Sequence, residues 1–261
     1  MISRNLDKAR DAYKKHDAAA SQVAHSATEA IELHRAGGQY IKSLIYGGLD
    51  GIITTFAVVA GVAGASLSAG IVLILGFANL LADGLSMAIG DYLSTRAETE
   101  YAAAERRREE WEVANYPEGE KQEMIELYME KGISLEDAEQ MTAILSKYES
   151  AWVDVMMVEE LGILEEKESP LKNALVTIFS FAVFGFVPLL AYVVAQWVSI
   201  FDDNTFFVAS ALTASTLFVL GVQKVRFTNK HWFISGFEML LIGGIAAIAA
   251  YGIGVLLSGL A

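Results

Sequence analysis

A row of four side chains that could bind a cation runs through an apolar stretch in the first half of the chain. The stretch GFANLLADGLSMAIGDYL, residues 76–93, contains Asn79, Asp83, Met87 and Asp91, each four residues after the one before. In a helix that spacing places all four on one face. An amide oxygen, two carboxylates and a thioether form a mixed set of hard and soft donors, which suits a divalent transition metal better than Ca²⁺ or Mg²⁺.

Two more acids interrupt other apolar stretches. Asp50 lies in GGLDGIITTF, and Glu238 lies in SGFEMLLIGG, close to the start of its stretch. A charged side chain inside a bilayer is costly, so acids at membrane depth mark ion pathways by default. We therefore predict a translocation path that contains Asp50, Asp83 and Glu238 together with the rest of the row. Asp91 fits an interfacial residue equally well, and a Met such as Met87, taken alone, is more often a packing residue.

These residues lie in what we predict to be membrane helices. The chain of 261 residues is 54% hydrophobic, more than the 45–50% typical of a soluble domain. Its apolar residues gather in five runs that reach or approach the ~20 residues that a membrane helix needs. The predicted spans are 42–66, 67–93, 171–198, 205–222 and 232–257. Pro188 is expected to kink the third span. The fold class is thus an all-α integral membrane protein with five transmembrane helices.

The positive residues predict the orientation of these spans. Of the 19 Lys and Arg residues, seven lie before or at the first residue of the first span, nine lie between the second span and the first two residues of the third, and three lie between the fourth and fifth. The other connections have none. The positive-inside rule then places the N-terminus, the polar insert between spans two and three, and the loop 223–231 in the cytoplasm. A vacuolar-type membrane and a bacterial inner membrane satisfy this topology equally.

The insert contains all of the net acidity. Residues 94–170 include 21 acidic and 8 basic side chains, a difference of −13, which equals the net charge of the whole chain. We expect the second span to continue as a helix to Asn115, a second helix over 118–131, and a third over 135–161 capped by Ser134 in the capping-box sequence SLED. The predicted units are 1–40, a cytoplasmic amphipathic helix without a signal-peptide pattern; 41–93, spans one and two; 94–170, the insert; and 171–261, spans three to five.

Several Glu and Met side chains of the insert have metal-ligand spacing. They stand three or four residues apart or fall within about one helical turn, so they share helix faces. The candidates are Glu109, Glu112, Glu120, Glu123, Met156, Met157 and Glu160. A segment this rich in Glu produces such spacings by chance as well, and the methionine pair beside Trp152 is also typical of a core. The spacing alone leaves a metal site and a solvated surface both open.

The segments LDGIITTFAVVAGVAGA, ADGLSMAIGDYLS, MMVEELG and SGFEMLLIGGIAAIAAYGIG, in this order around an acidic insert, resemble the vacuolar iron transporter family. The resemblance covers roughly residues 40–257. It implies a homodimer of five-helix subunits, an antiporter that exchanges Fe²⁺ for protons along the subunit interface, where the first two spans line the path. Asp50 and Met87 would be path residues. The insert would be a cytoplasmic metal-binding domain with the seven candidates above as ligands, and Mn²⁺, Zn²⁺ or Co²⁺ as further ions that it could hold.

Two positions depart from the family pattern. Ser43 and Asn79 stand where the family has acids, and Asp83 and Glu238 are expected to take over their charge. The proton stoichiometry and the preference between Fe²⁺ and Mn²⁺ therefore stay open. We found no nucleophile–base pair, phosphate-binding loop or dinucleotide motif, so we expect no enzyme, no cofactor and no nucleic-acid partner.

The predicted function is proton-coupled export of Fe²⁺ from the cytosol, into a vacuole-like compartment or out of the cell. A broader Mn²⁺/Fe²⁺ exporter is the alternative. A membrane-anchored ferroxidase or iron buffer is disfavoured, because the insert contains no His and hence no Glu-x-x-His pair.

Overall fold

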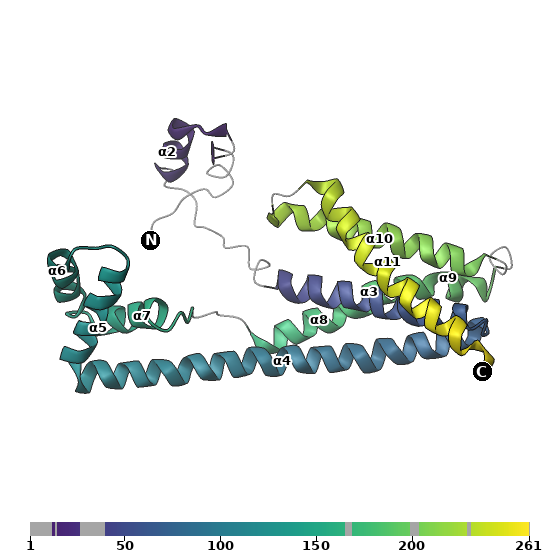
Figure 1. Cartoon of the computed structure of the whole chain (residues 1–261), viewed down its shortest axis with the longest axis horizontal. Helices are drawn as coiled ribbons and strands as arrows, with labels where there is room; N and C mark the ends of the chain where they lie inside the picture. Colours follow the sequence, from purple (N-terminus) through teal and green to yellow (C-terminus); the bar gives the residue numbers. More distant parts are fainter. Residues whose placement is uncertain are drawn as a thin grey trace.

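The structure is a computed structural model that describes residues 12–13, 15–26, 40–164, 169–198, 204–228 and 231–260. Within these ranges all regular structure is helical, as predicted. A bundle of apolar helices and a smaller group of polar helices are joined by one long helix (Figure 1). The helices are α2 (Ala18–Ser26), α3 (Ile41–Gly64), α4 (Ala69–Asn115), α5 (Pro117–Glu130), α6 (Leu135–Leu145), α7 (Glu149–Glu159), α8 (Pro170–Gly185), α9 (Val187–Ala195), α10 (Thr205–Thr228) and α11 (Trp232–Leu257), with a final 3₁₀ turn η2 (Ser258–Leu260).

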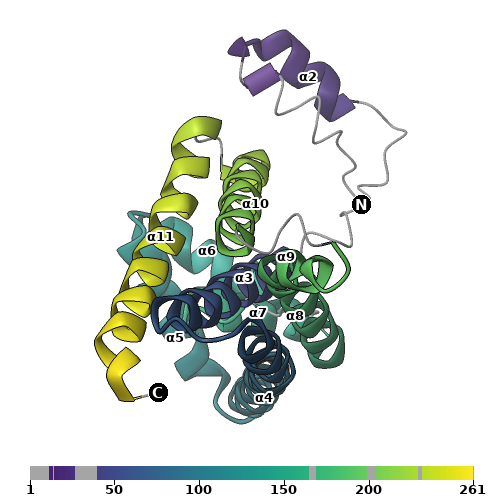
Figure 2. The ribbon, with the colours of Figure 1, turned by 90° about the vertical axis from the view of Figure 1, so that its right-hand side faces the viewer.

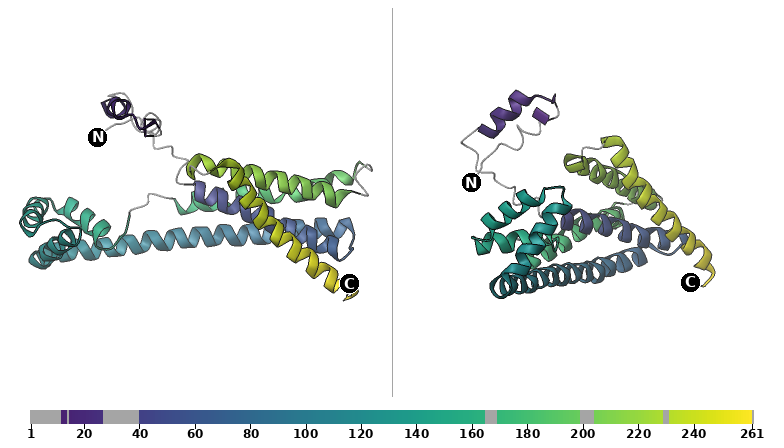
Figure 3. Two further views of the ribbon diagram at one scale, coloured as in Figure 1. Left: turned by 45° about the horizontal axis from the view of Figure 1, so that its top comes forward. Right: turned by 60° about the vertical axis from the view of Figure 1, so that its left-hand side comes forward.

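The long helix α4 is continuous over 47 residues. At 1.5 Å per residue it is about 70 Å long, more than twice the ~30 Å hydrocarbon core of a bilayer. It contains no proline, and it ends where Tyr116 leaves helical geometry (φ −137°, ψ 53°) before Pro117 begins α5. The prediction of one helix from the membrane segment to Asn115 is confirmed. Its far end therefore carries α5, α6 and α7 away from the apolar bundle, as the left view of Figure 3 shows.

Four helices are long and apolar enough to span a membrane: α3, the apolar part of α4, α10 and α11. A fifth span exists if α8 and α9 count as one, since they form a pair bent by 45°. The bend lies at Phe186, and Pro188 is in the first turn of α9. Proline lacks an N–H and its ring clashes with the carbonyl four residues earlier, so a break just before Pro188 is the expected consequence.

Helix α3 lies at the centre of the bundle and contacts α4, α8, α9, α10 and α11 (Figure 2). Part of it packs backbone to backbone against α8. A Cβ added to Gly47 would lie 2.5 Å from the Thr177 carbonyl oxygen, and one added to Gly51 would overlap the Phe181 carbonyl. The glycines four residues apart thus allow the two backbones to touch.

The helices α5, α6 and α7 pack around the end of α4 on a second apolar core. Its buried members are Val113, Met124, Trp152, Val153, Met156 and Met157. The single helix predicted over 135–161 is wrong: the chain turns at Ser146–Tyr148 and separates α6 from α7. No Gly or Pro marks this turn. It arises because α6 packs against α5, whereas α7 packs against α4, and one straight helix cannot do both.

Local capping signals in this region are confirmed. Ser134 caps α6: its hydroxyl accepts a hydrogen bond from the Asp137 amide (3.2 Å) and donates one to the Asp137 carboxylate (2.7 Å). Gly132 and Gly162 follow α5 and α7 with φ of 88° and 66°, the left-handed geometry that glycine adopts without strain.

The N-terminal segment lies largely outside the described residues. In the part that is described, the chain turns at His16 (φ 53°), and the Asp17 carboxylate accepts a hydrogen bond from the Ala20 amide (2.9 Å) at the start of α2. The expected single helix over 1–40 is therefore not continuous through His16.

Candidate metal sites in the insert and in the membrane bundle

Three carboxylates converge in the insert from three different helices. Glu109 is on α4, Glu120 is on α5, and Glu160 is the residue after the last turn of α7. One oxygen from each lies within 4.8 Å of the other two. Glu109 is 1% exposed and Glu120 is 4% exposed, whereas Glu160 is on the surface. Separated by up to 51 residues in sequence, they share one small volume, hereafter the carboxylate cluster.

The buried members of the carboxylate cluster are poorly satisfied by the protein. No described residue donates a well-aligned hydrogen bond to either oxygen of Glu109 or to Oε2 of Glu120, although Oε1 of Glu109 forms an ion pair with Arg108. Burial and the charge of Glu160 raise the pKa of Glu109 to about 7; burial and the charge of Glu123 raise that of Glu120 to about 7. Buried acids of this kind need a proton or a cation, and converging oxygens are suited to a divalent ion.

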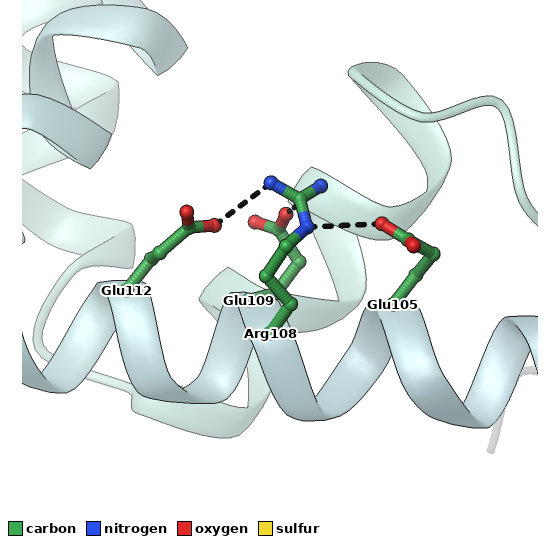
Figure 4. Close-up of polar contacts among 4 residues, drawn as sticks. All are labelled: Glu105, Arg108, Glu109 and Glu112. Carbon is green, nitrogen blue, oxygen red and sulfur yellow. Dashed lines mark hydrogen bonds and ion pairs between the residues drawn. The ribbon is translucent and has the colours of Figure 1, made fainter.

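A guanidinium lies beside the carboxylate cluster. Arg108 forms ion pairs with Glu105 (Nε–Oε2, 2.9 Å), with Glu109 (Nη2–Oε1, 3.0 Å) and with Glu112 (Nη1–Oε2, 3.0 Å), as Figure 4 shows. All four residues are on α4. The Arg108 side chain is 44% exposed, so it reaches the buried Glu109 from the solvent side. Sequence reasoning missed this residue.

The other predicted ligands lie in two different environments, at the edge of the carboxylate cluster and in the apolar core. Glu112 is half-buried and paired with Arg108, and Glu123 is on the surface. Burial of Glu160 is the main cause of its raised pKa, and the charge of Glu123 is the second. Glu112 and Glu123 surround the cluster. Met156 and Met157 are 0% and 2% exposed, and both belong to the apolar core of the insert. The predicted glutamates thus lie in or beside the carboxylate cluster, whereas the predicted methionines are packed in the apolar core.

In the membrane bundle, the deepest predicted acids lie on facing helices. Asp50 of α3 and Asp83 of α4 are both half-buried and close enough to interact electrostatically. Asn79 donates a hydrogen bond to the Thr54 hydroxyl (3.3 Å), which itself donates to the backbone carbonyl of Asp50 (2.9 Å). Among the residues that the structure describes, neither aspartate forms an ion pair with Lys or Arg. The two acids therefore lie close together, without a basic partner in the part of the chain that the structure describes.

The remaining path candidates are placed differently. Asp91 accepts a hydrogen bond from the Thr177 hydroxyl of α8, so it holds two helices together. Met87 is half-buried on α4. Glu238 of α11 pairs with Lys224 of α10, with 3.7 Å between Oε2 and Nζ. These contacts do not bring Asp91 or Glu238 to the aspartate pair, and their roles in a path stay predictions.

Known proteins match this architecture along nearly its whole length. The model of the VIT family matches residues 41–255. A vacuolar iron transporter of Toxoplasma gondii is 43% identical over 97% of this chain and 89% of its own length, and that of Plasmodium falciparum is 39% identical over 98% of each. Vacuolar iron transporter 1 of Arabidopsis thaliana is 35% identical over 84% of this chain and 87% of its own.

The extent of these matches also corrects one boundary. A match over 97% of the chain must include most of the first 40 residues, so the resemblance extends further than 40–257 in the two parasite proteins. The match to the Arabidopsis protein is shorter. Apolar spans, the intervening acidic helices and the family match lead to one conclusion: this chain belongs to the VIT family.

Proposed function

We propose that this protein transports Fe²⁺ across a membrane in exchange for protons. Membership of the VIT family, and relatives named as vacuolar iron transporters, support iron transport. They also favour a transporter over an enzyme. The observation that carries the proton-coupled part is the pair Asp50 and Asp83, which are close enough to interact electrostatically and have no basic partner among the described residues.

The proposed transport step follows from ligand chemistry. A carboxylate must be ionised to bind a metal, so a dication that enters between Asp50 and Asp83 displaces their protons. When the metal leaves on the other side, two adjacent acids in a medium of low dielectric constant rebind protons because their mutual repulsion is otherwise uncompensated. Asn79 and Thr54 connect the same two helices and would orient this pair. Metal and proton thus occupy the site alternately.

The proposed role of the insert is to collect metal for this step. Its charge of −13 attracts cations, and the carboxylate cluster offers converging oxygens. The positive-inside rule favours a cytoplasmic insert and hence export from the cytosol. A homodimer with a path at the subunit interface is part of the proposal. It is supported by the family resemblance and by exposed apolar side chains on the membrane part of α4, including Ile74, Leu81 and Ile89.

The test is transport by the full-length protein in liposomes with an internal pH dye. Wild-type protein should take up Fe²⁺ in response to a proton gradient and move protons the other way. Asp50→Asn keeps size and hydrogen-bonding capacity but cannot exchange a proton, so both fluxes should be lost. Retained metal binding by the insert of the same variant would show that it is folded. Wild-type rates in Asp50→Asn would refute the mechanism.

The alternative substrate, Mn²⁺, is favoured by one observation. The carboxylate cluster contains oxygen donors, whereas Met156 and Met157 are packed in the apolar core. Carboxylates alone suit Mn²⁺ as well as Fe²⁺. Competition between the two ions in the same liposomes separates an iron-selective transporter from a broader one. Oxygen consumption on addition of Fe²⁺ would instead indicate a ferroxidase.

A further inference from the structure

Arg108 occupies an unusual position for a side chain next to a cation site. It carries a positive charge, yet it contacts Glu109, a buried member of the carboxylate cluster, at 3.0 Å. It also contacts Glu105 and Glu112, one turn away on either side of the same helix. In this structure the three acids are thus paired with the guanidinium of Arg108 (Figure 4).

A metal ion and Arg108 cannot both interact with the cluster at full strength. A dication among Glu109, Glu120 and Glu160 adds two positive charges within a few ångströms of the guanidinium, and like charges at such distances repel. The Arg108 side chain has room to move away from the cluster. Its side chain is 44% exposed and retains Glu105 and Glu112 as partners, so it can shift away from Glu109 and stay paired.

We propose that Arg108 is an internal counter-cation that competes with the metal for the carboxylate cluster and thereby sets how weakly the insert holds its cargo. This inference rests on the proposed metal-binding function of the insert. Arg108 neutralises part of the site while it is empty, moves toward Glu105 when metal binds, and returns to Glu109 as metal leaves. A collecting site must release its ion to the membrane path, and a competing cation speeds that release.

The chain offers a matched control. Arg107 is the adjacent residue, is also exposed, and lines a different cavity with Arg106 and Glu110. Arg107→Gln and Arg108→Gln each remove one positive charge from the insert. Only the second removes a contact to Glu109. A difference between them therefore reports the local competition and not the overall field.

The experiment is Mn²⁺ titration of the full-length protein in detergent at about pH 8, with Glu109→Gln to identify the binding that belongs to the cluster. Arg108→Gln should bind Mn²⁺ roughly tenfold more tightly, the factor for a dication and a unit charge about 6 Å apart in a water-like dielectric. Release to a chelator should slow by a similar factor. Arg107→Gln should stay within about twofold, since its charge is more distant and screened. Arg108→Lys, which keeps the charge without the planar fork, should lie between wild type and Arg108→Gln.

Each result has a clear meaning. Equal or weaker Mn²⁺ binding in Arg108→Gln, with Arg108→Lys also weakened, would show that the arginine supports the site and would overturn the inference. Equal tightening in Arg107→Gln would do the same, because it would attribute the effect to net charge. Wild-type protein without any Glu109-dependent Mn²⁺ binding would refute the metal site itself, which is a separate failure.

Discussion

The carboxylate cluster of the insert and the aspartate pair of the membrane bundle solve the same electrostatic problem in different ways. Both bring acids together with little direct compensation. The cluster has Arg108 at its edge, open to solvent, and the pKa values of its two buried members, Glu109 and Glu120, are raised to about 7. Asp50 and Asp83 have no basic partner among the described residues, and the nearby hydrogen bonds, from Asn79 to Thr54 and from Thr54 to the backbone carbonyl of Asp50, join neutral groups.

This difference fits the two tasks we propose. A site that only collects metal can use a cation of the protein to keep its affinity moderate. A site that exchanges metal for protons cannot contain a fixed cation, because that charge would stabilise the ionised acids and remove the need for a proton. The comparison makes the two sites separable by mutation, by pH and by the chemistry of their donors.

The largest expected effect comes from removing the acids of one region and measuring both. The double change Glu109→Gln and Glu120→Gln should abolish Mn²⁺ binding by the insert, at least about a hundredfold, because two of three ligand charges are lost. Transport at saturating metal should persist. Asp83→Asn should show the opposite pattern, with binding intact and transport lost. Equilibrium binding and liposome flux measured on the same preparations check both.

The control for this exchange is Asp154→Asn, an exposed acid of the insert that pairs with Arg106 and is not part of the cluster. It should leave both readouts unchanged. If the glutamate double variant loses transport even at saturating metal, the insert is part of the obligatory path, and the separation into two tasks is wrong.

A smaller effect is expected from pH, and its sign follows from the pKa values. Burial raises the pKa values of Glu109 and Glu120 from 4.5 to about 7, so below pH 7 these side chains hold protons that a metal must displace. Mn²⁺ affinity of the insert should be flat above about pH 8 and fall by about tenfold per pH unit per displaced proton below 7. The same shift makes the metal-free fold lose stability as pH rises from 4.5 to 7.

Isothermal titration at several pH values checks the affinity, and buffers of different ionisation enthalpy report the protons released. Glu109→Gln should flatten the profile in proportion to its lost proton. Affinity that is constant between about pH 8 and 6 would mean that both acids titrate at ordinary values, and the cluster would then be an ordinary surface group.

Local chemistry made part of this fold predictable from the sequence. Pro188 predicted the bend between α8 and α9, Pro117 predicted the end of α4, and Ser134 predicted the start of α6. Each acts through its own backbone or its nearest neighbours. The turn between α6 and α7 has no such signal, because packing against two different helices produces it.

The candidate sites divide in the same way. Spacing named Glu109, Glu120 and Glu160 in three separate groups, and only the tertiary fold brings the three together. Spacing placed Asp91 in the row, but its hydrogen bond with Thr177, 86 residues away, could not be read from the sequence, and its role in a path stays a prediction. Arg108 was overlooked in the run RRREE, which is typical of a solvated surface. The available signal was an arginine with acids at positions −3, +1 and +4.

The smallest expected effect tests whether the methionines are ligands or core. Met156 is fully buried among Trp152 and other apolar residues, one turn before Glu160. Met156→Leu keeps volume and hydrophobicity, so the free energy of unfolding should fall by less than about 1.5 kcal/mol. Mn²⁺ affinity should change by no more than about threefold, because that ion prefers oxygen donors. Chemical unfolding and Mn²⁺ titration measure the two effects. A loss of affinity as large as that of Glu109→Gln would show that the sulfur turns out of the core to bind metal, and the two regions would then share a mixed set of donors.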